Sequence, residues 1–189
     1  MKRFVSVYPP AFNSTYVKAT TKGDGYGEPF FAVNPSKPLT GAAIYNAWVG
    51  EDSYQRFHID LGSPIIINGV YCEAYHDSGA NCYWGMNHIL MQGSNSAAAF
   101  ADLTYTHDTN WSTIYFNGTN QLMPHVALNI SEPQFLYFTN STAYQYYAFK
   151  FVDNWGDSLM GIRRIELLKE IDVAEISTSS IQNISSISF

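Results

Sequence analysis

Short stretches that combine Trp or Tyr with Asn, Asp and His are the part of this sequence best suited to chemistry. They occur at residues 75–87, 105–111 and 153–158. An aromatic ring can stack on the apolar C–H face of a sugar, while amide, carboxylate and imidazole groups hydrogen bond to its hydroxyl groups. The stretches therefore favour a sugar site built from loops. We expect its residues to be Tyr75, His76, Asp77, Asn81, Tyr83, Trp84, Asn87, Asn154, Trp155 and Asp157.

Further residues of the same types are candidates beside these. They are His107, Asp108, Asn110 and Trp111 in the second stretch, and Tyr45, Asn46 and Trp48 earlier in the chain. Trp84 and Trp155 stand among Gly, Asn and Asp, so we expect their rings to be exposed and available to a ligand.

The acidic side chains do not single out a catalytic pair. Glycoside hydrolysis needs two carboxylates across a cleft, and Asp77, Asp108, Asp153 and Asp157 all lie in expected loops. Asp in loops commonly forms turns, and nothing distinguishes two of these four. The sequence contains no HExxH, GxSxG, CxxC or P-loop motif. We therefore expect no catalytic activity.

Charge and hydropathy argue against several kinds of partner. The 189 residues carry a net charge of −6, and Lys and Arg never exceed two in a row. Such a surface attracts neither a phosphate backbone nor an anionic membrane, and no apolar run approaches the ~20 residues of a membrane helix. We expect neither nucleic-acid binding nor membrane insertion. Arg163 and Arg164 are expected to pair with acidic neighbours. Glu166 is expected to help hold the last strand, residues 162–168, in place.

Alternating apolar residues predict β-strands at residues 57–61 and 143–152, each with one buried face. Residues 62–64 (Gly-Ser-Pro) are expected to break the chain at a corner. Residues 65–67 (Ile-Ile-Ile) are then expected to form a strand buried on both faces. His58, which alternates with core residues, is expected at the surface.

Turn-forming Gly, Asn and Pro separate many further short apolar runs. Strands are expected at residues 4–8, 70–75, 88–92, 113–116, 126–130, 134–138 and 162–168, and the most helix-like segment is 96–103. Many short strands with little helix are typical of an antiparallel sandwich or jelly roll. The sequence therefore predicts an all-β fold with one domain, residues 1–170.

Residues 171–189 differ from the rest of the chain. They are rich in Ser, and Ile181, Ile184 and Ile187 recur at every third position, which suits neither an amphipathic helix nor a regular strand. We interpret them as an extended C-terminal arm that docks on a neighbour, either another structural protein or a second copy in a homo-oligomer. A frayed terminus is the alternative.

Four pieces of the sequence, taken in order, resemble the discoidin family, which includes the coagulation factor 5/8 type C domains and the galactose-binding-like carbohydrate modules. The pieces are a strand ending in Asp60-Leu61-Gly62, the run Gln92-Gly93-Ser94-Asn95 followed by Trp111-Ser112-Thr113, the strand Tyr146–Phe151, and the closing strand Gly161–Leu167. The resemblance spans roughly residues 30–168.

This resemblance implies an eight-stranded antiparallel jelly-roll β-sandwich that binds ligand with loops at one end and performs no catalysis. It also implies that Trp48 and Trp111 pack in the core. Many family members hold a structural calcium ion near an early Asp-Gly turn. That position reads Asn34-Pro35 here and lacks the carboxylate ligand, so we expect no metal or other cofactor.

These observations favour a non-catalytic module that binds a glycan, a host-surface receptor or another partner. The apolar segment at residues 4–8 is too short for the core of a signal peptide. Cys72 and Cys82 could form one disulfide, but two cysteines alone do not decide this. We expect a virion component, such as a phage decoration, tail or fibre protein, or a protein at an extracellular surface made without its own signal. A cytoplasmic location is the alternative. The rival functions are a structural cement protein that binds no sugar and an accessory module of a carbohydrate-active enzyme.

Overall fold

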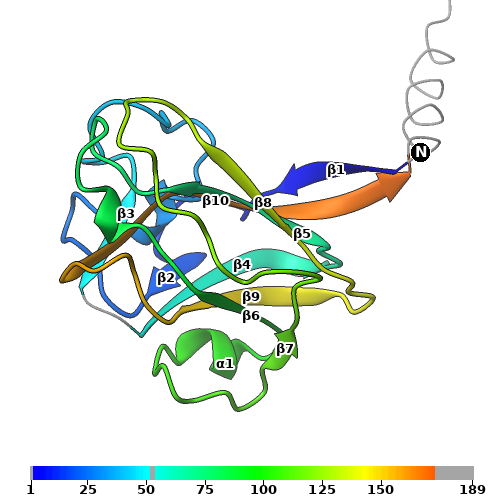
Figure 1. Ribbon diagram of the computed structural model, residues 1–189. Coiled ribbons are helices and arrows are strands. Elements are labelled where there is room, and N and C mark those ends of the chain that lie inside the picture. Colours follow the sequence, from blue (N-terminus) through cyan, green and yellow to red (C-terminus); the bar gives the residue numbers. More distant parts are fainter. Residues whose placement is uncertain (1, 52–53, 173–189) are drawn as a thin grey trace, which may run out of the picture.

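The computed structural model of the chain describes residues 2–51 and 54–172. They form ten β-strands in two antiparallel sheets of five strands each, which lie face to face (Figure 1). The expected β-sandwich is confirmed, with ten strands where eight were expected. The elements are β1 (Lys2–Val7), β2 (Val17–Ala19), η1 (Pro29–Phe31), β3 (Trp48–Glu51), β4 (Gln55–Ile65), β5 (Gly69–Ala74), η2 (Cys82–Trp84), β6 (Ile89–Ser94), α1 (Ala97–Ala101), β7 (Ser112–Ile114), β8 (Pro133–Tyr137), β9 (Tyr144–Phe151) and β10 (Leu159–Asp172).

Each sheet is arranged around one long strand from the second half of the chain. The β9 sheet has the order β2-β4-β9-β6-β7, and the β10 sheet has the order β1-β10-β5-β8 with β3 also paired to β10. Lys2 pairs with Asp172, so β1 and the end of β10 lie side by side at one end of the sandwich (Figure 1). Most of the expected arm, residues 173–189, lies outside the described residues.

The core lies between the sheets and is rich in aromatic rings. Tyr147, Phe149 and Phe151 share the inner face of β9, as their alternation predicts, and all three are fully buried. The Trp48 ring packs against Phe57 and Phe151, with centroid distances of 5.3 and 5.6 Å. Trp48 is therefore a core residue, as the resemblance implied.

The outer face of the β9 sheet is covered as well, by α1 and residues 102–111. Ser96 caps α1 by accepting a hydrogen bond from the amide of Ala99, and the helix sets Phe100 over the sheet. His58 lies beneath it and is fully buried, 4.9 Å from the half-buried Trp111 ring. The expectation that His58 is at the surface was wrong, because alternation along a strand cannot show that a distant segment covers its second face.

Asp108 holds this cover in place through charge. The buried cations Arg56 and Lys150 both contact its carboxylate, and Gln92 donates a hydrogen bond to it at 2.9 Å. Although burial opposes ionisation, the hydrogen bonds from Gln92 and Lys150 lower the pKa of Asp108. Residues 105–111 thus neutralise buried charge, and their likeness to a sugar site reflects this structural task.

Three local expectations were wrong, one corner and two strands. Residues 62–64 form no corner: β4 continues to Ile65 with an irregularity in its pairing after Asp60, and Gly62 adopts a φ of 75° that suits glycine. Ile66 is exposed, so residues 65–67 are not a strand buried on both faces. Residues 126–130 form an exposed loop, because no neighbouring strand pairs with them among the described residues. Within residues 2–51 and 54–172, the helices η1, η2 and α1 have five residues or fewer, too few to cross a membrane.

Acid should destabilise the fold through His58. Burial lowers the pKa of His58 from 6.5 to about 4. The hydrogen bond with the Phe100 carbonyl and the charge of Asp102 oppose this shift, while the charges of Arg56 and Lys18 add to it. The unfolded chain therefore binds a proton near pH 6.5 that the folded chain refuses, so stability is full above pH 6.5 and falls towards pH 4. With about 1.4 kcal/mol per pKa unit, the loss is on the order of 3 kcal/mol.

Urea unfolding at several pH values measures this effect. The control is His58→Asn, which keeps a donor for the Phe100 carbonyl (3.0 Å from Nδ1) but does not titrate. We expect a clearly flatter dependence of stability on pH for the variant. Equal slopes for the two proteins would contradict the assignment to His58.

Candidate functional site

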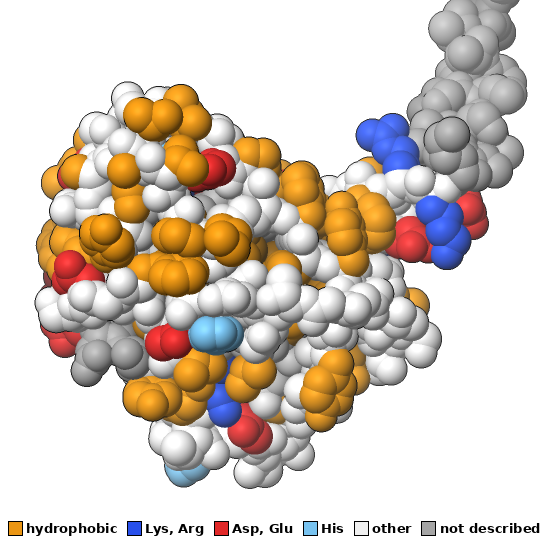
Figure 2. All heavy atoms as spheres, in the orientation of Figure 1, with side chains coloured by type: hydrophobic (Ala, Val, Ile, Leu, Met, Phe, Trp, Pro, Cys, Tyr) orange, Lys and Arg blue, Asp and Glu red, His pale blue; other side chains and the backbone are white. Residues whose placement is uncertain are grey.

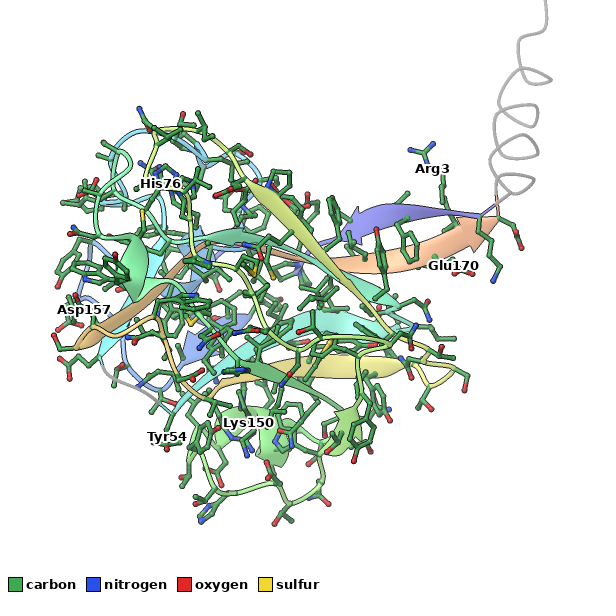
Figure 3. The ribbon with its side chains drawn as sticks, viewed as in Figure 1. Arg3, Tyr54, His76, Lys150, Asp157 and Glu170 are labelled. Atoms are coloured by element: carbon green, nitrogen blue, oxygen red, sulfur yellow. The ribbon has the colours of Figure 1, made fainter. Side chains whose placement is uncertain are left out.

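The structure brings two of the expected ligand-binding stretches together, residues 75–87 and 153–158. The Trp155 amide donates to the Tyr83 carbonyl at 3.1 Å, and the Asn87 amide to the Asp153 carbonyl at 3.1 Å. We call the end of the sandwich formed by residues 22–27, 42–51, 75–87 and 153–159 the loop end. Asp157 and His76 lie on this side of the molecule, far from Arg3 and Glu170 near the termini (Figure 3).

Trp84 and Tyr75 form a stacked pair with centroids 5.1 Å apart and planes 24° apart. Tyr75 is buried, and its ring fills the space beside Gly161, where an added Cβ would lie 2.5 Å from the ring. Both rings pack on a small cluster of Ala43, Ala47 and Val49. Tyr75 is therefore structural, and Trp84 is half-buried, less exposed than the sequence suggested.

Tyr83 is the most accessible of the expected aromatic residues. It lies in the short helix η2, which Asn81 begins with a left-handed φ of 56°, a conformation that Asn tolerates well. The Tyr83 side chain is 67% exposed. Tyr83 can therefore meet a ligand without displacing any part of the core.

His76 and Asp77 serve the protein itself. His76 Nε2 donates to the Leu39 carbonyl at 2.9 Å, while Nδ1 accepts from the Gly79 amide at 3.0 Å. Its ring stacks on that of His125, and burial lowers the pKa of His76. Asp77 accepts the Ala43 amide at 3.0 Å. Both ring nitrogens of His76 are therefore occupied, whereas Asp77 uses one carboxylate oxygen to hold the loop.

Asn154 organises the turn at residues 153–158. Its Oδ1 accepts the amides of Gly156 and Asp157, and its Nδ2 donates to the carbonyls of Asp157 and Leu159. Burial opposes ionisation of the Asp157 carboxyl, but hydrogen bonds from the Ser158 and Leu159 amides and from Trp84 lower its pKa. The exposed Asp157 carboxylate is therefore held ionised beside Trp84.

Trp155 and Asn87 contribute less surface than expected. Trp155 is half-buried, and its Nε1 is buried without an acceptor in the described part of the chain. Asn87 Nδ2 donates to Asp153 at 3.3 Å, and its Oδ1 accepts from Gln121 at 2.9 Å. Asn87 therefore ties loops together.

Arg163 was expected to pair with an acidic neighbour, and this was wrong. Its fully buried guanidinium donates to three backbone carbonyls, those of Leu39 (3.3 Å), Gly41 (2.7 Å) and Ala42 (2.9 Å). Burial lowers the pKa of Arg163, but a guanidinium remains charged in proteins. Carbonyl dipoles here replace the expected carboxylate. The neighbouring arginine, Arg164, does pair with Glu166, at 2.9 Å.

Residues 22–27, which are absent from the expected ligand-binding residues, also contribute to the loop end. A hollow of about 250 Å³ lies there, lined by Lys22, Gly23, Asp24, Tyr26, Val49, Gly50, Glu51 and Leu159. Tyr26 forms one wall and is 48% exposed. Its ring packs on Gly23, where an added Cβ would lie 2.5 Å from the ring. A Tyr between two glycines, Gly25 and Gly27, was the signal for this site.

Hydrophobic side chains gather in a band across the loop end, with acidic side chains at its margins (Figure 2). The exposed aromatic residues of the loop end include Tyr26, Tyr45 and Tyr83. The Tyr45 amide donates to the Tyr26 carbonyl at 2.8 Å, so two of these residues are directly connected. The loop end thus offers several aromatic rings beside carboxylates.

Metal ligands do not gather at the loop end or elsewhere in residues 2–51 and 54–172, where no group of three or more His, Cys, Asp and Glu lies together. At the position that aligns with the calcium turn, the Asn34 carboxamide accepts the Ser36 amide at 3.0 Å. Cys72 and Cys82 are both free and buried, and burial raises the pKa of each thiol.

Replacing Arg163 should loosen the loop end and destabilise the fold. Arg163→Met removes one charged donor from three backbone carbonyls, each of which keeps a second donor in His76, Ser78 or Asn46. We expect a loss of about 1.5–3 kcal/mol in urea unfolding. Arg163→Lys keeps the charge but cannot reach all three carbonyls, so its loss should be intermediate. Arg3→Ala, on the exposed side of β1, is the control and should change little. An Arg163→Met variant as stable as the wild type would contradict this role.

Comparisons with known proteins agree on the architecture. No protein-family model and no curated protein sequence matches this chain. A truncated AlyQ with CBM32 and alginate lyase domains matches with a TM-score of 0.58 and 18% identity over 92% of this chain, which spans 35% of that structure. The CBM32 of AlyQ in complex with 4,5-unsaturated mannuronic acid gives 0.54 and 18%, covering 86% of this chain and 97% of the module.

A third similar structure is CpGH89CBM32-5 from Clostridium perfringens, in complex with GalNAc-β-1,3-galactose. It gives a TM-score of 0.56 at 15% identity, covering 80% of this chain and 92% of the module. Identities this low establish the fold alone. The sandwich predicted from the strand pattern and from the discoidin resemblance is thus confirmed, and this chain has the discoidin-like, galactose-binding-like fold.

Proposed function

We propose that this chain is a non-catalytic carbohydrate-binding module that holds a sugar at the loop end. The observation that carries the proposal is the hollow beside Tyr26, where a half-exposed ring is fixed on Gly23 and faces charged side chains. A ring held in place before binding loses little conformational entropy when a ligand stacks on it.

The polar residues of the hollow suit hydroxyl groups. Lys22 is anchored by Glu28 at 2.7 Å, while Asp24 is almost fully exposed and Glu51 lies at the rim. Carboxylates accept hydrogen bonds from sugar hydroxyls, and an ammonium group donates to them. Tyr83 and the Asp157 carboxylate beside Trp84 extend the same surface along the loop end.

The ligands of similar structures support this reading. The AlyQ module binds an unsaturated mannuronic acid, and the C. perfringens module binds a GalNAc-galactose disaccharide. AlyQ also joins its CBM32 to alginate lyase domains, which favours an accessory module of a carbohydrate-active enzyme as the second candidate function. A virion component for attachment to a host surface and a cement protein that binds no sugar stay predictions from the sequence.

A glycan array probed with the full chain tests the proposal. We expect binding to a defined set of glycans, and titration calorimetry of the best one should show about a tenfold weaker affinity for Tyr26→Ala, equal to about 1.4 kcal/mol. Tyr83→Ala should weaken binding as well. Both side chains are exposed enough to remove without unfolding the protein.

Tyr115→Ala is the matched control, because Tyr115 is 80% exposed and lines a separate hollow with Leu90 and Asn120. It should bind like the wild type. If the wild-type protein binds no glycan on the array, the proposal is refuted and the cement protein is favoured. If both Tyr26→Ala and Tyr83→Ala bind the glycan with unchanged affinity, the sugar does not bind at the loop end.

A further inference from the structure

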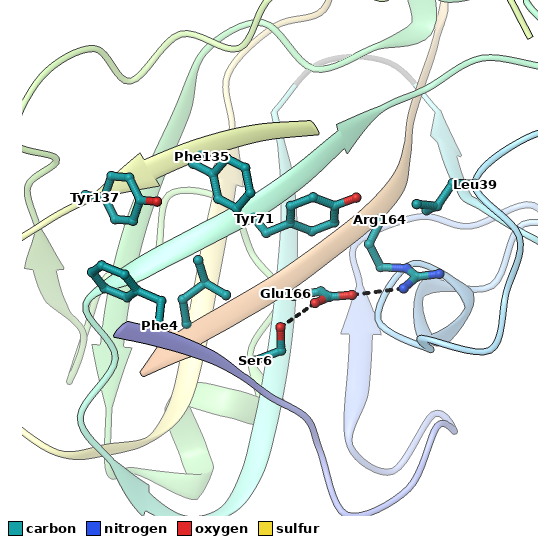
Figure 4. Close-up of a pocket in the computed structure, with 9 residues that line it drawn as sticks. Phe4, Ser6, Leu39, Tyr71, Phe135, Tyr137, Arg164 and Glu166 are labelled. Atoms are coloured by element: carbon teal, nitrogen blue, oxygen red, sulfur yellow. Dashed lines mark hydrogen bonds and ion pairs between the residues drawn. The ribbon is translucent and has the colours of Figure 1, made fainter. Parts of the chain in front are cut away.

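The outer face of the β10 sheet carries a row of aromatic side chains that the loop-end site does not use. Phe4 from β1, Tyr71 from β5, and Phe135 and Tyr137 from β8 line one hollow of about 400 Å³ (Figure 4). Phe135 and Tyr137 are 50% and 43% exposed. In contrast to the β9 sheet, whose outer face lies under α1 and residues 102–111, this face is open in the described structure.

Strand register explains why these rings share a face. Phe135 pairs with Tyr71 and Tyr137 pairs with Gly69, and directly paired residues project from the same side of a sheet. Gly69 has no side chain, so the Tyr137 ring lies over the strand, where an added Cβ would be 3.0 Å from it. The planes of Phe135 and Tyr137 differ by only 5° at a centroid distance of 6.3 Å. The two rings are therefore nearly parallel, two residues apart on β8.

The charged side chains that line this hollow are paired with each other, although Arg164 Nε has no hydrogen-bond partner among the described residues. Glu166 accepts hydrogen bonds from Ser6 at 2.6 Å and from Arg164 at 2.9 Å (Figure 4). The Tyr71 hydroxyl donates to Glu73, which also accepts Ser131. A charged ligand would find no free counter-charge here, whereas a neutral ligand with many hydroxyl groups can use the outward lone pairs and donors.

A second hollow of about 440 Å³ adjoins the first. The two share Phe4 and Tyr137, whose rings contact each other at a centroid distance of 4.8 Å. The other walls of the second hollow are mostly polar: Lys2, Asn68, Asn117, Thr139, Asn140 and Glu170, with Phe138. Lys2 and Glu170 form an ion pair, so this part is also close to neutral. Together the hollows make a groove with aromatic rings on one side and amides on the other.

We propose that this groove binds a neutral oligosaccharide of several units, as a second site independent of the loop end. Flat, parallel rings suit the faces of pyranose rings, and the amides of the second hollow suit their hydroxyl groups. A peptide partner that docks as an apolar helix or strand would need a groove lined by aliphatic side chains. In the first hollow only Leu39 and Leu168 are aliphatic. Two hollows in series match a chain of sugars better than a single residue.

Titration calorimetry with the full chain tests the second site. The probes are neutral hexasaccharides of β-linked glucose, mannose and N-acetylglucosamine, with the matching monosaccharides and an alginate hexasaccharide as comparison. We expect one neutral hexasaccharide to bind at least tenfold more tightly than its monosaccharide and than the alginate chain. Tyr137→Ala should weaken that binding at least tenfold.

Two milder variants keep the test decisive if Tyr137→Ala affects folding. Phe135→Ala and Asn117→Ala remove exposed side chains and should each weaken hexasaccharide binding severalfold. Tyr26→Ala should leave it unchanged, whereas Tyr137→Ala should leave binding at the loop end unchanged. Hexasaccharide binding lost in Tyr26→Ala but kept in Tyr137→Ala would overturn the second site while supporting the first.

Other occupants of the groove give distinct outcomes. A dimer in light scattering that Tyr137→Ala dissociates would mean that a second copy covers the groove. A full-length variant with Ile181, Ile184 and Ile187 changed to Ser tests the C-terminal residues: shifts of the Phe135 and Tyr137 signals in its NMR spectrum would mean that these residues fill the groove. Either result, or no binding of any neutral hexasaccharide, would overturn the proposal.

Discussion

The buried guanidinium of Arg163 is the constraint on which the loop end depends. Because three carbonyls of residues 39–42 satisfy it, this segment must wrap around the start of β10. In the same segment, the Gly41 carbonyl accepts a hydrogen bond from the Ser78 amide, and the Gly41 amide donates one to the Asn129 side chain. One cation thus joins four distant parts of the chain. Direct hydrogen bonds between loops, such as that from the Trp155 amide to the Tyr83 carbonyl, then complete this end.

The two sheets solve the same problem, an exposed outer face, in different ways. The β9 sheet buries Arg56, His58 and Lys150 under a local cover, and Asp108 in that cover pairs with both cations. The β10 sheet instead keeps its polar groups in pairs, such as Arg164 with Glu166, and leaves aromatic rings half-exposed. A covered face has no room for a ligand, whereas an open face with satisfied charges and accessible rings has the properties of a binding surface.

Local pattern was enough to predict the sandwich, because the alternation of apolar residues in β9 and the short turns depend only on residues close together in the sequence. It was not enough for the second faces: His58 looks exposed until residues 96–111 fold back over it, and that contact spans about forty residues or more. The candidate site was found in part. Tyr83 and Asp157 are accessible, but His76, Asp77 and Asn154 hold loops together, since the same polar residues that bind sugars also form turns.

Tyr26, Phe135 and Tyr137 show what sequence patterns hide. Each is half-exposed because a glycine lies beside or beneath its ring, or because its strand is at an edge, and neither condition is visible from residue type alone. Rings held by strands and glycine contacts are preorganised, which lowers the entropy lost on binding. Loops can change sequence without disturbing rings held by strands. The two proposed sites therefore differ in kind: strands fix the rings of the sheet face, whereas the loop end can vary in sequence.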